Sequence, residues 1–424
     1  MTPEVKERIE QIRHGNVPEG YWNTTVGIIP TDWHVGTVRD CIEEFKLLSN
    51  DIEHIPVYSS SRKGLIPQSD YYDQREATET NLGYKVVPQG YVTYRHMSDD
   101  DVFHFNINNT GGEILVSSEY PVFTASPKGQ LGFLVPALNG TARFRYFCKT
   151  QKLGGTRTRL YLENLKKYGL ALPPLKEQCT IAEILSAQDK VIELKEKLLS
   201  GKQQQKKYLM QQLLTGKKRL PGFDGEWQNC RLHQIAKRIR RKNTIGNENV
   251  LTISAQYGLI NQSEFFNKEI ASEDKSNYYL LNRNDFAYNK SYSSGYPFGA
   301  IKRLTRYDVG IVSPLYICFE IVGDHVSLEY MEQYFEAGLM NREIQAFAQE
   351  GARNHGLLNI AVDDFFNAKI VLPSLEEQQA ITAILTAADR EIELLRQSLE
   401  QEKQKKKALM QLLLTGIVRV TTNK

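Results

Sequence analysis

Side chains that could carry out chemistry are present in this chain, but they are not grouped in the patterns that known reactions require. The eight histidines lie far apart, and the five cysteines include no Cys-x-x-Cys pair. The acidic pair Asp363-Asp364 could form a catalytic dyad, but such a pair is more often part of a solvated turn. The residue types therefore favour neither a zinc cluster nor an activated nucleophile.

Short motifs for binding phosphates, dinucleotides or catalytic zinc are also missing. The sequence contains no GxxxxGK[ST] loop, no GxGxxG after a strand and no HExxH. The segment 172–175 reads Leu-Pro-Pro-Leu and lacks the Asn that begins the Asn-Pro-Pro-aromatic tetrad of amino-methyltransferases. Together these absences predict a protein that binds rather than reacts, and an enzyme stays only a minor hypothesis.

Size and composition set broad limits on the class of protein. A chain of 424 residues with 41% hydrophobic and 24% charged residues is typical of a soluble protein of two to four domains. The formal charge of +3 permits a local nucleic-acid-binding patch but does not argue for one. No apolar run is long enough to cross a bilayer, and the scattered cysteines favour a reducing cytoplasm.

A stretch of about fifty residues occurs twice in the chain. Segment 172–219 aligns without a gap with segment 372–419, and about half of the paired residues are identical. A repeat of this kind indicates one structural unit that was built twice. It predicts a molecule that meets its partner through two related halves.

Both copies of the repeat carry apolar residues at alternating steps of three and four. This 3.5-residue period is typical of a coiled coil and lasts about four heptads. Polar residues such as Gln188 and Lys406 interrupt the stripe and would fix the register of pairing. An isolated heptad run often serves as a core or dimerisation element, but two copies favour an antiparallel pair within the chain. The pairing residues are expected to be Leu185, Ile192, Leu199, Leu209, Leu213, Leu385, Ile392, Leu395, Leu399, Leu409 and Leu413.

Start and stop signals frame both helices. Ser374 followed by Glu377 predicts a capping box at the start of the second helix, and Pro173-Pro174 marks the start of the first. Gly216 and Gly416 each end a Leu-Leu-Thr-Gly sequence and predict C-terminal caps.

The segments outside the repeat have a different composition. Residues from about 33 to 160 and from about 227 to 360 are rich in Tyr, Phe, Val, Gly, Asn and Ser, in short alternations typical of strands and turns. They predict two α+β modules on a helical frame, in a pseudo-twofold arrangement. The expected boundaries are 1–32 (N-terminal helix and lead-in), 33–171 (module 1), 172–219 (first helical region), 220–371 (module 2) and 372–424 (second helical region).

The two modules and two helical regions, in this order along the chain, resemble the specificity (S) subunits of type I restriction-modification systems. The resemblance covers nearly the whole chain. The most specific segments are two LPxLxEQ sequences, at 172–178 and 372–378, and two LMQxLLTG sequences, at 209–216 and 409–416. A single LLTG would be weak, but the ordered set found twice is specific.

The resemblance implies two target-recognition domains that alternate with two conserved helices, in a subunit that reads double-stranded DNA without doing chemistry. Each domain would read one half of a bipartite target, and the helices would set the spacing between the halves. Two methyltransferase (M) subunits would dock on the helices, and two restriction (R) subunits would join through the complex. S-adenosylmethionine, ATP and Mg would be bound by these partners and not by this chain. The expected location is cytoplasmic, with no membrane contact.

Candidate DNA contacts follow from the side chains that recognise groove edges, sugars and bases. Tyr94 also fits a core position. The core is favoured because Tyr94 alternates with apolar neighbours. Arg157 and Arg353 could contact the helices instead of DNA, and Lys290 and Tyr292 could simply flank a solvated loop. The candidates are Tyr94, Arg95, Arg157, Arg159, Asn289, Lys290, Tyr292, Arg353, Asn354 and His355.

Two other interpretations stay open. One is a non-enzymatic scaffold whose two variable modules bind proteins. The other is the specificity subunit of a fused restriction-methylation enzyme outside type I, which would differ in its partners. The lysine runs at 202–207 and 403–407 are interpreted mainly as a solvated face, with partner docking or a phosphate-facing stripe as the alternative.

Overall fold

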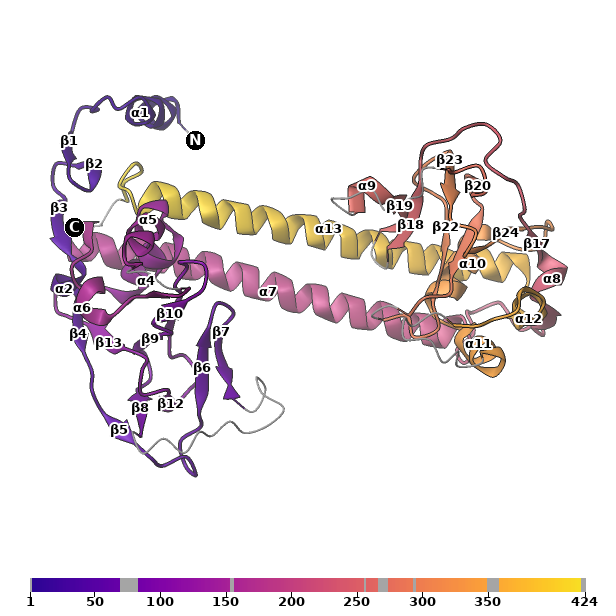
Figure 1. The fold of residues 1–424 in the computed structure, drawn as a ribbon, viewed down its shortest axis with the longest axis horizontal. Helices are drawn as coiled ribbons and strands as arrows, with labels where there is room; N and C mark the ends of the chain where they lie inside the picture. The colour runs from indigo at the N-terminus through magenta and orange to yellow at the C-terminus, as the bar shows by residue number, and fades with distance from the viewer. Residues whose placement is uncertain are drawn as a thin grey trace. The chain divides into compact units, whose positions relative to one another are not determined.

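The chain folds into two compact units. Unit 1 comprises Met1–Glu196 and Gln397–Lys424, and unit 2 comprises Lys197–Arg396. Each unit therefore contains one module and one half of each long helix. The sequence pattern, in contrast, predicts each helical region as a separate part of the chain. The computed structural model describes residues 2–68, 83–152, 156–254, 257–265, 274–292, 295–348 and 358–420 (Figure 1).

The elements before the second module alternate short strands with short helices and end in a long helix. They are α1 (Pro3–Arg13), β1 (Tyr21–Thr24), β2 (Gly27–Pro30), β3 (His34–Thr37), α2 (Val38–Cys41), β4 (Ile42–Glu44), β5 (Leu48–Ser49), β6 (Tyr58–Ser61), β7 (Gly64–Pro67), β8 (Tyr84–Val87), β9 (Val92–Tyr94), β10 (Met97–Ser98), β11 (Phe105–Ile107), β12 (Ile114–Val116), β13 (Val122–Ala125), α4 (Leu131–Gly140), α5 (Ala142–Thr150), β14 (Thr158–Arg159), α6 (Leu162–Leu165), β15 (Gly169–Leu172) and α7 (Leu175–Leu213).

The second half of the chain repeats this plan. Its elements are β16 (Gln228–Arg231), α8 (Leu232–Ile235), β17 (Ala236–Arg238), β18 (Leu251–Ser254), β19 (Gly258–Asn261), α9 (Gln262–Phe265), β20 (Tyr279–Asn282), β21 (Phe286–Asn289), β22 (Ala300–Arg303), β23 (Val309–Val312), β24 (Ile317–Ile321), α10 (Leu328–Glu336), α11 (Asn341–Phe347), α12 (Val362–Asn367), β25 (Lys369–Leu372) and α13 (Leu375–Leu413).

The two modules share one topology although their sequences have diverged. The main sheet has the order β11-β9-β13-β4 in module 1 and β22-β21-β24-β17 in module 2, and every pair of neighbours is antiparallel. Tyr94 on β9 and Tyr288 on β21 occupy equivalent places, and both side chains are fully buried. The prediction of two α+β modules is confirmed.

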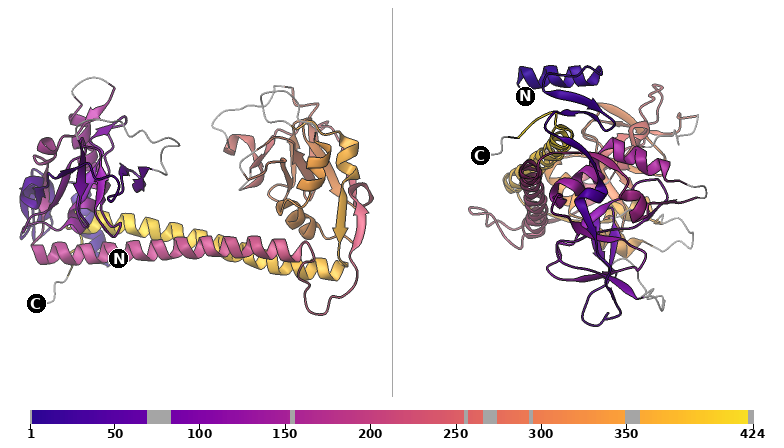
Figure 2. Two further views of the ribbon diagram at one scale, coloured as in Figure 1. Left: turned by 90° about the horizontal axis from the view of Figure 1, so that it is seen from below. Right: turned by 90° about the vertical axis from the view of Figure 1, so that its left-hand side faces the viewer.

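The first and last strands of each module close it just before its long helix. In module 1, β15 pairs with β3, and in module 2, β25 pairs with β16. Figure 2 shows, for each unit taken alone, that the module lies to one side of its helix segments. Among the described residues, no helix is both long and apolar enough to cross a membrane.

The long helices α7 and α13 pair along the predicted heptads. In unit 1 the first half of α7 contacts the last half of α13, and in unit 2 the reverse holds, so the pair is antiparallel as predicted. Both helices have 39 residues. The predicted pairing residues are Leu185, Leu213, Leu385, Ile392, Leu399 and Leu413, which are buried, and Ile192, Leu199, Leu209, Leu395 and Leu409, which are partly buried.

Polar residues in the seam contact each other across it. In unit 1, Gln188 Nε2 donates to Glu402 Oε2 at 2.8 Å, and Lys195 Nζ lies 3.1 Å from Glu402 Oε1. Lys406 pairs with Asp189 in unit 1, and the equivalent Lys206 pairs with Asp389 in unit 2.

Some lysines of the two runs form ion pairs between the helices. This role comes in addition to the solvated face and the docking or phosphate-facing stripe that the sequence left open. Lys202 lies 2.8 Å from Glu391, and Lys403 lies 2.7 Å from Glu196. Because such pairs depend on the axial position of the two helices, they support one register of the coiled coil.

A buried carboxylate in each unit joins the module, the start of one long helix and the segment that follows the other. Glu177, in the first turn of α7, accepts a hydrogen bond from Trp33 Nε1 at 3.0 Å and two from Arg419 at 2.8 Å each. In unit 2, Glu377 accepts one from Trp227 Nε1 at 3.0 Å and two from Arg219. These contacts explain why the repeat keeps this glutamate, this arginine and a tryptophan at the start of each module.

The glutamine that follows this glutamate fixes the module itself. Gln178 Oε1 accepts from the backbone N–H of Gln130 at 3.1 Å, and Gln378 Oε1 accepts from the N–H of Ser327 at 2.9 Å. Both side chains also donate to the carbonyl of the proline five residues earlier. The Glu-Gln pair of the repeat is therefore the joint between frame and module.

The predicted helix ends are partly correct. Gly216 and Gly416 have φ of 68° and 72°, the left-handed conformation of a glycine C-cap. The capping box is wrong in one half, because the Glu377 side chain binds Arg219 and Trp227 instead of turning back to its own helix start. The Ser374 hydroxyl still accepts from the Glu377 N–H at 3.4 Å.

Candidate nucleic-acid interface

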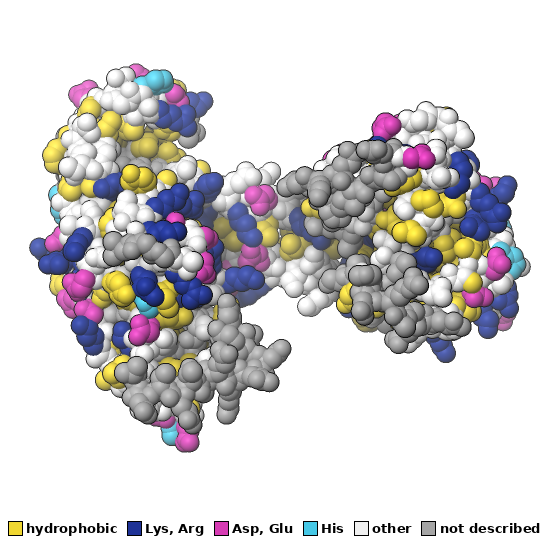
Figure 3. Space-filling view, in the orientation of Figure 1, with side chains coloured by type: hydrophobic (Ala, Val, Ile, Leu, Met, Phe, Trp, Pro, Cys, Tyr) yellow, Lys and Arg dark blue, Asp and Glu magenta, His cyan; other side chains and the backbone are white. Residues whose placement is uncertain are grey.

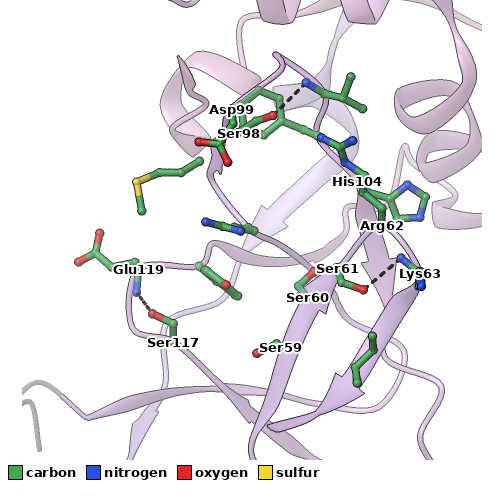
Figure 4. A pocket seen from close by; sticks show the side chains of 16 residues that line it. Ser59, Ser60, Ser61, Arg62, Lys63, Ser98, Asp99, His104, Ser117 and Glu119 are labelled. Carbon is green, nitrogen blue, oxygen red and sulfur yellow. Dashed lines mark hydrogen bonds between the residues drawn. The ribbon is translucent and has the colours of Figure 1, made fainter. Parts of the chain in front are cut away.

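A cavity in module 1 brings together polar side chains from segments far apart in the sequence. Its volume is about 720 Å³, and it lies between the β6–β7 hairpin, the end of β9 and the loops after β10 and β12. Figure 4 shows Ser59, Ser60 and Ser61 on one wall and Ser117 and Glu119 on the opposite wall. The other lining residues are Arg62, Lys63, Ile66, Arg95, Met97, Ser98, Asp99, Val102, Phe103, His104 and Tyr120.

Two of three consecutive aspartates form ion pairs with arginine side chains beside this cavity. Asp100 forms an ion pair with Arg62, and this contact lowers the pKa of the Asp100 carboxyl. Asp99 Oδ1 accepts from Arg157 Nε at 2.9 Å. These exposed ion pairs orient the two guanidinium groups toward the aspartate loop.

The third aspartate shapes the loop. Asp101 has φ of 61°, which is unusual for a residue with a side chain. Its carboxylate accepts a hydrogen bond from the Thr158 hydroxyl. This bond joins the aspartate loop to β14, whose other residue is Arg159.

Two histidines of this region are shielded from solvent, His96 fully and His104, a lining residue of the cavity, in part. His96 is 3% exposed, and its Nδ1 has no hydrogen-bond partner in the described part of the chain. Its ring stacks on Tyr161 with centroids 5.6 Å apart, and its Nε2 lies 3.8 Å from Glu119 Oε2. Burial lowers the pKa of His96 and of His104, so both rings are neutral near pH 7.

The structure brings three of the four predicted residues of module 1 together. Arg95 lines the cavity, Arg157 binds its lining residue Asp99, and Arg159 pairs in strand register with Met97. The structure contradicts the inclusion of Tyr94 among the candidate DNA contacts. Its ring is fully buried and its hydroxyl donates to the Leu160 carbonyl at 2.9 Å, so it supports the core and does not face a ligand.

In module 2 the described candidates lie at the end of β21. The Asn289 side chain accepts from the Ser291 N–H at 3.1 Å, and the Lys290 carbonyl accepts from the Leu358 N–H at 3.0 Å. Tyr292 is 64% exposed. Arg353, Asn354 and His355 lie outside the described residues, so their placement stays a prediction, as does DNA contact for all the exposed candidates.

Other cations were missed from the sequence. Arg62 and Lys63 lie in the turn of the β6–β7 hairpin, and the signal that could have found them is a Ser-Arg-Lys-Gly turn between two short alternations. A run from Lys237 to Lys242 holds five basic residues in six; it begins in the edge strand β17 of module 2 and continues past its end. Figure 3 shows Lys and Arg side chains gathered on the visible faces of both units, with Asp and Glu among them.

The arrangement can bind but carries no sign of covalent chemistry. Burial raises the pKa of the Cys41 thiol to about 11 and that of Cys148 and Cys318 to about 12, so these sulfurs are poor nucleophiles at neutral pH. Within the described ranges, no group of three or more His, Cys, Asp or Glu could hold a metal ion. Guanidinium, ammonium and hydroxyl groups at a cavity edge are suited to hydrogen bonds with base edges and phosphates.

Comparison with known proteins places this arrangement in a family. The family described as "Type I restriction modification DNA specificity domain" matches residues 100–201 and 224–404, about two thirds of the chain. A Methanocaldococcus jannaschii protein that carries the name of the MjaX type I restriction enzyme specificity subunit is 26% identical, over 95% of this chain and 98% of its own length.

Solved structures share the fold. The S subunit of a type I restriction-modification system from M. genitalium matches 96% of this chain and 100% of its own, with a TM-score of 0.55 and 11% identity. A second structure, from work on complex assembly and conformational transition of the type I R-M system, matches 92% of this chain and 99% of its own, with a TM-score of 0.54 and 14% identity. Because the family match covers more than half of the sequence, the chain belongs to the type I restriction modification DNA specificity domain family, whose members are specificity subunits and not catalysts.

Proposed function

We propose that this chain reads a bipartite target in double-stranded DNA, one half with each module, for a type I restriction-modification complex. The observation that carries the proposal is one scaffold built twice with different exposed residues. At the equivalent edge strands, β4 presents Glu43 and Glu44 where β17 presents Lys237 and Arg238. Because the scaffold is the same and the surface differs, the two modules are suited to two different half-sites.

The long helices are proposed to dock two M subunits. Val191 and Leu194 place exposed apolar side chains one turn apart on α7, and Leu394 occupies on α13 the place that corresponds to Leu194. Leu194 is 53% exposed and Leu394 is 58% exposed. An apolar side chain at the same place in both copies supports two equivalent docking positions for one kind of partner.

The helices are also proposed to set the spacing between half-sites. Insertion of one heptad after Glu196 and one after Arg396 would keep the seam in phase in both helices. Seven residues add about 10 Å to a helix, so the gap between half-sites is expected to grow by roughly three base pairs at 3.4 Å each. Methylation with an unchanged gap would contradict the spacer role.

The chemistry of the complex is proposed to belong to its partners. S-adenosylmethionine is expected on the M subunits, and ATP and Mg on the two R subunits that join through the complex. The absence of their binding motifs from this sequence supports that division. A cytoplasmic location goes with the proposal.

The test is to purify the chain with any methyltransferase encoded beside it and to select from a pool of random DNA. Enrichment of one motif with two separated halves is the expected result. A stable protein complex that enriches no sequence would favour the scaffold interpretation instead. Enrichment of a single unbroken motif would contradict the assignment of one half-site to each module.

A further inference from the structure

The two modules carry equivalent β-hairpins that the sequence analysis did not assign to any function. In module 1, β6 and β7 pair antiparallel up to Ser61 and Gly64, and in module 2, β18 and β19 pair up to Ser254 and Gly258. Just before each hairpin, one residue forms a parallel bridge to an equivalent strand of its module. These bridges join Val57 to Leu115 and Val250 to Ile311. The hairpins therefore occupy the same place in the shared topology.

The first hairpin is fixed to the main sheet close to its turn, at Ser60 and Ser61. The side-chain amide of Asn106, on β11, donates to Ser60 Oγ at 2.8 Å and to the Ser61 carbonyl at 2.9 Å. Asn106 and Ser60 are both buried. Buried hydrogen bonds of this kind hold the hairpin in one orientation, because breaking them leaves polar groups without partners.

The second hairpin is fixed by a comparable set of amides. Asn261, at the end of β19, donates through Nδ2 to Asn249 Oδ1 at 2.8 Å. Asn249 in turn donates to the Val309 carbonyl at 2.9 Å. The Asn261 N–H also donates to the Tyr307 hydroxyl at 3.2 Å. Side-chain amides thus fix both hairpins, the first close to its turn and the second at its base.

The turns of the two hairpins differ in chemistry. The first turn presents Arg62 and Lys63 at the edge of the cavity, followed by Gly64 with φ of 112°. The second presents Tyr257, which is 55% exposed, followed by Gly258 with φ of 72°. Phosphates are the same in every sequence, whereas base edges differ. A rigid ribbon that keeps its place and changes its tip is therefore suited to reading bases rather than phosphates.

From this relationship we propose that the two hairpins are the base-reading elements, and that Arg62 and Lys63 recognise guanine in the half-site of module 1. A two-stranded ribbon fits the major groove, where guanine offers two acceptors, O6 and N7, to Arg or Lys. Asp100 holds the Arg62 guanidinium at the tip. Tyr257 serves the other half-site. The inference rests on the proposed function, since it assigns the parts of a bipartite reader.

The experiment uses the complex of the full chain with its methyltransferase and compares three variants with the wild type. The first variant combines Arg62→Ala with Lys63→Ala, and the second is Tyr257→Ala. The control is Lys149→Ala, which removes an exposed cation on α5 of module 1 away from the cavity. Base preference at each position of the motif is measured by selection from random DNA, and thermal unfolding shows that each variant is folded.

The expected result is a separation of the two effects. The double variant loses roughly tenfold to a hundredfold of its preference for guanine at one position of one half-site. Tyr257→Ala relaxes only the other half-site, and Lys149→Ala changes neither. An equal loss of affinity for all sequences would overturn the inference, because it marks phosphate contacts, as would unchanged preferences in both variants. If the wild-type complex enriches no motif, the proposed function itself fails.

Discussion

Arg419 donates two hydrogen bonds of 2.8 Å to the carboxylate of Glu177, although 242 residues separate them in the sequence. The same guanidinium also donates to both carboxylate oxygens of Asp32 at 2.7 Å. These contacts raise the pKa of Arg419 and lower that of Asp32. The C-terminal end of the second repeat is thereby bonded to the start of α7 and to the lead-in of module 1.

The glutamate of this joint is expected to stabilise unit 1. Glu177→Gln removes one of the two carboxylate partners of the Arg419 guanidinium, leaving Asp32, and changes the acceptor of Trp33 Nε1. Disturbing a buried hydrogen-bonded group costs about 1–3 kcal/mol, which lowers the unfolding midpoint by a few degrees. Calorimetry of the full chain measures the shift. The control is Glu183→Gln, an exposed position on the same helix; equal midpoints for both variants would contradict this role of the joint.

The polar contacts in the seam are expected to depend on each other. Glu402→Leu removes the partner of Gln188 and Lys195 and should destabilise unit 1. Adding Lys195→Leu should recover part of the loss, because two facing apolar residues replace an ion pair at little cost. A double-mutant cycle by thermal unfolding measures the coupling. Additive effects, or an effect as large for the exposed Glu400→Leu, would show that the seam contacts are not coupled.

Stability is expected to fall as the solution is acidified from pH 7.5 to pH 5.5, in part through His96. Burial holds the pKa of His96 below its usual value near 6.5, despite the opposing charge of Glu119. The unfolded chain therefore takes up a proton in this range that the folded chain does not, which makes unfolding easier at lower pH. His96→Phe keeps the ring against Tyr161 and should reduce this dependence, with His104 supplying a remaining part.

Denaturant unfolding at the two pH values measures this difference. The nearby charges of Arg95, Arg159 and Lys85 also disfavour the protonated ring, so they act in the same direction as burial. The control is His34→Gln, because His34 is exposed. A wild-type stability that does not change with pH, or a His96→Phe variant with the full dependence, would contradict the prediction.

Docking of the M subunits is expected to need the outer faces of both long helices. Leu194→Glu and Leu394→Glu place a charge where an apolar side chain is exposed. Each should reduce the amount of methyltransferase that co-purifies with the chain, and together they should abolish it, while thermal unfolding of the chain alone stays the same. Ser200→Glu adds the same charge at another exposed position on α7. Full retention of the methyltransferase by the double variant would place the docking surface elsewhere.

The sequence could predict the helices and the two-module plan because their signals are local. The 3.5-residue period, the glycine caps and the repeat itself are visible without knowing which residues meet. Trp33 and Trp227 mark the module starts for the same reason. The capping box at Glu377 was wrong because a tertiary contact with Arg219 competed successfully with the local one.

The candidate interface was harder to predict because it depends on contacts between distant segments. Arg95 and Arg157 could be recognised by type and position. Arg62 was missed because its turn lies between strands of only four residues each, and because its pairing with Asp100 joins segments 38 residues apart. Tyr94 alternates with apolar residues, and this pattern correctly favoured the core over a DNA contact.

The central claim is that the two modules read two separated half-sites in DNA. The most direct measurement is a map of methylated adenines in cells that hold the partner methyltransferase, with and without this chain. We predict one motif of two short sequences with a fixed gap, methylated only when the chain is present. Methylation that does not depend on the chain, or a motif without a gap, would contradict the claim.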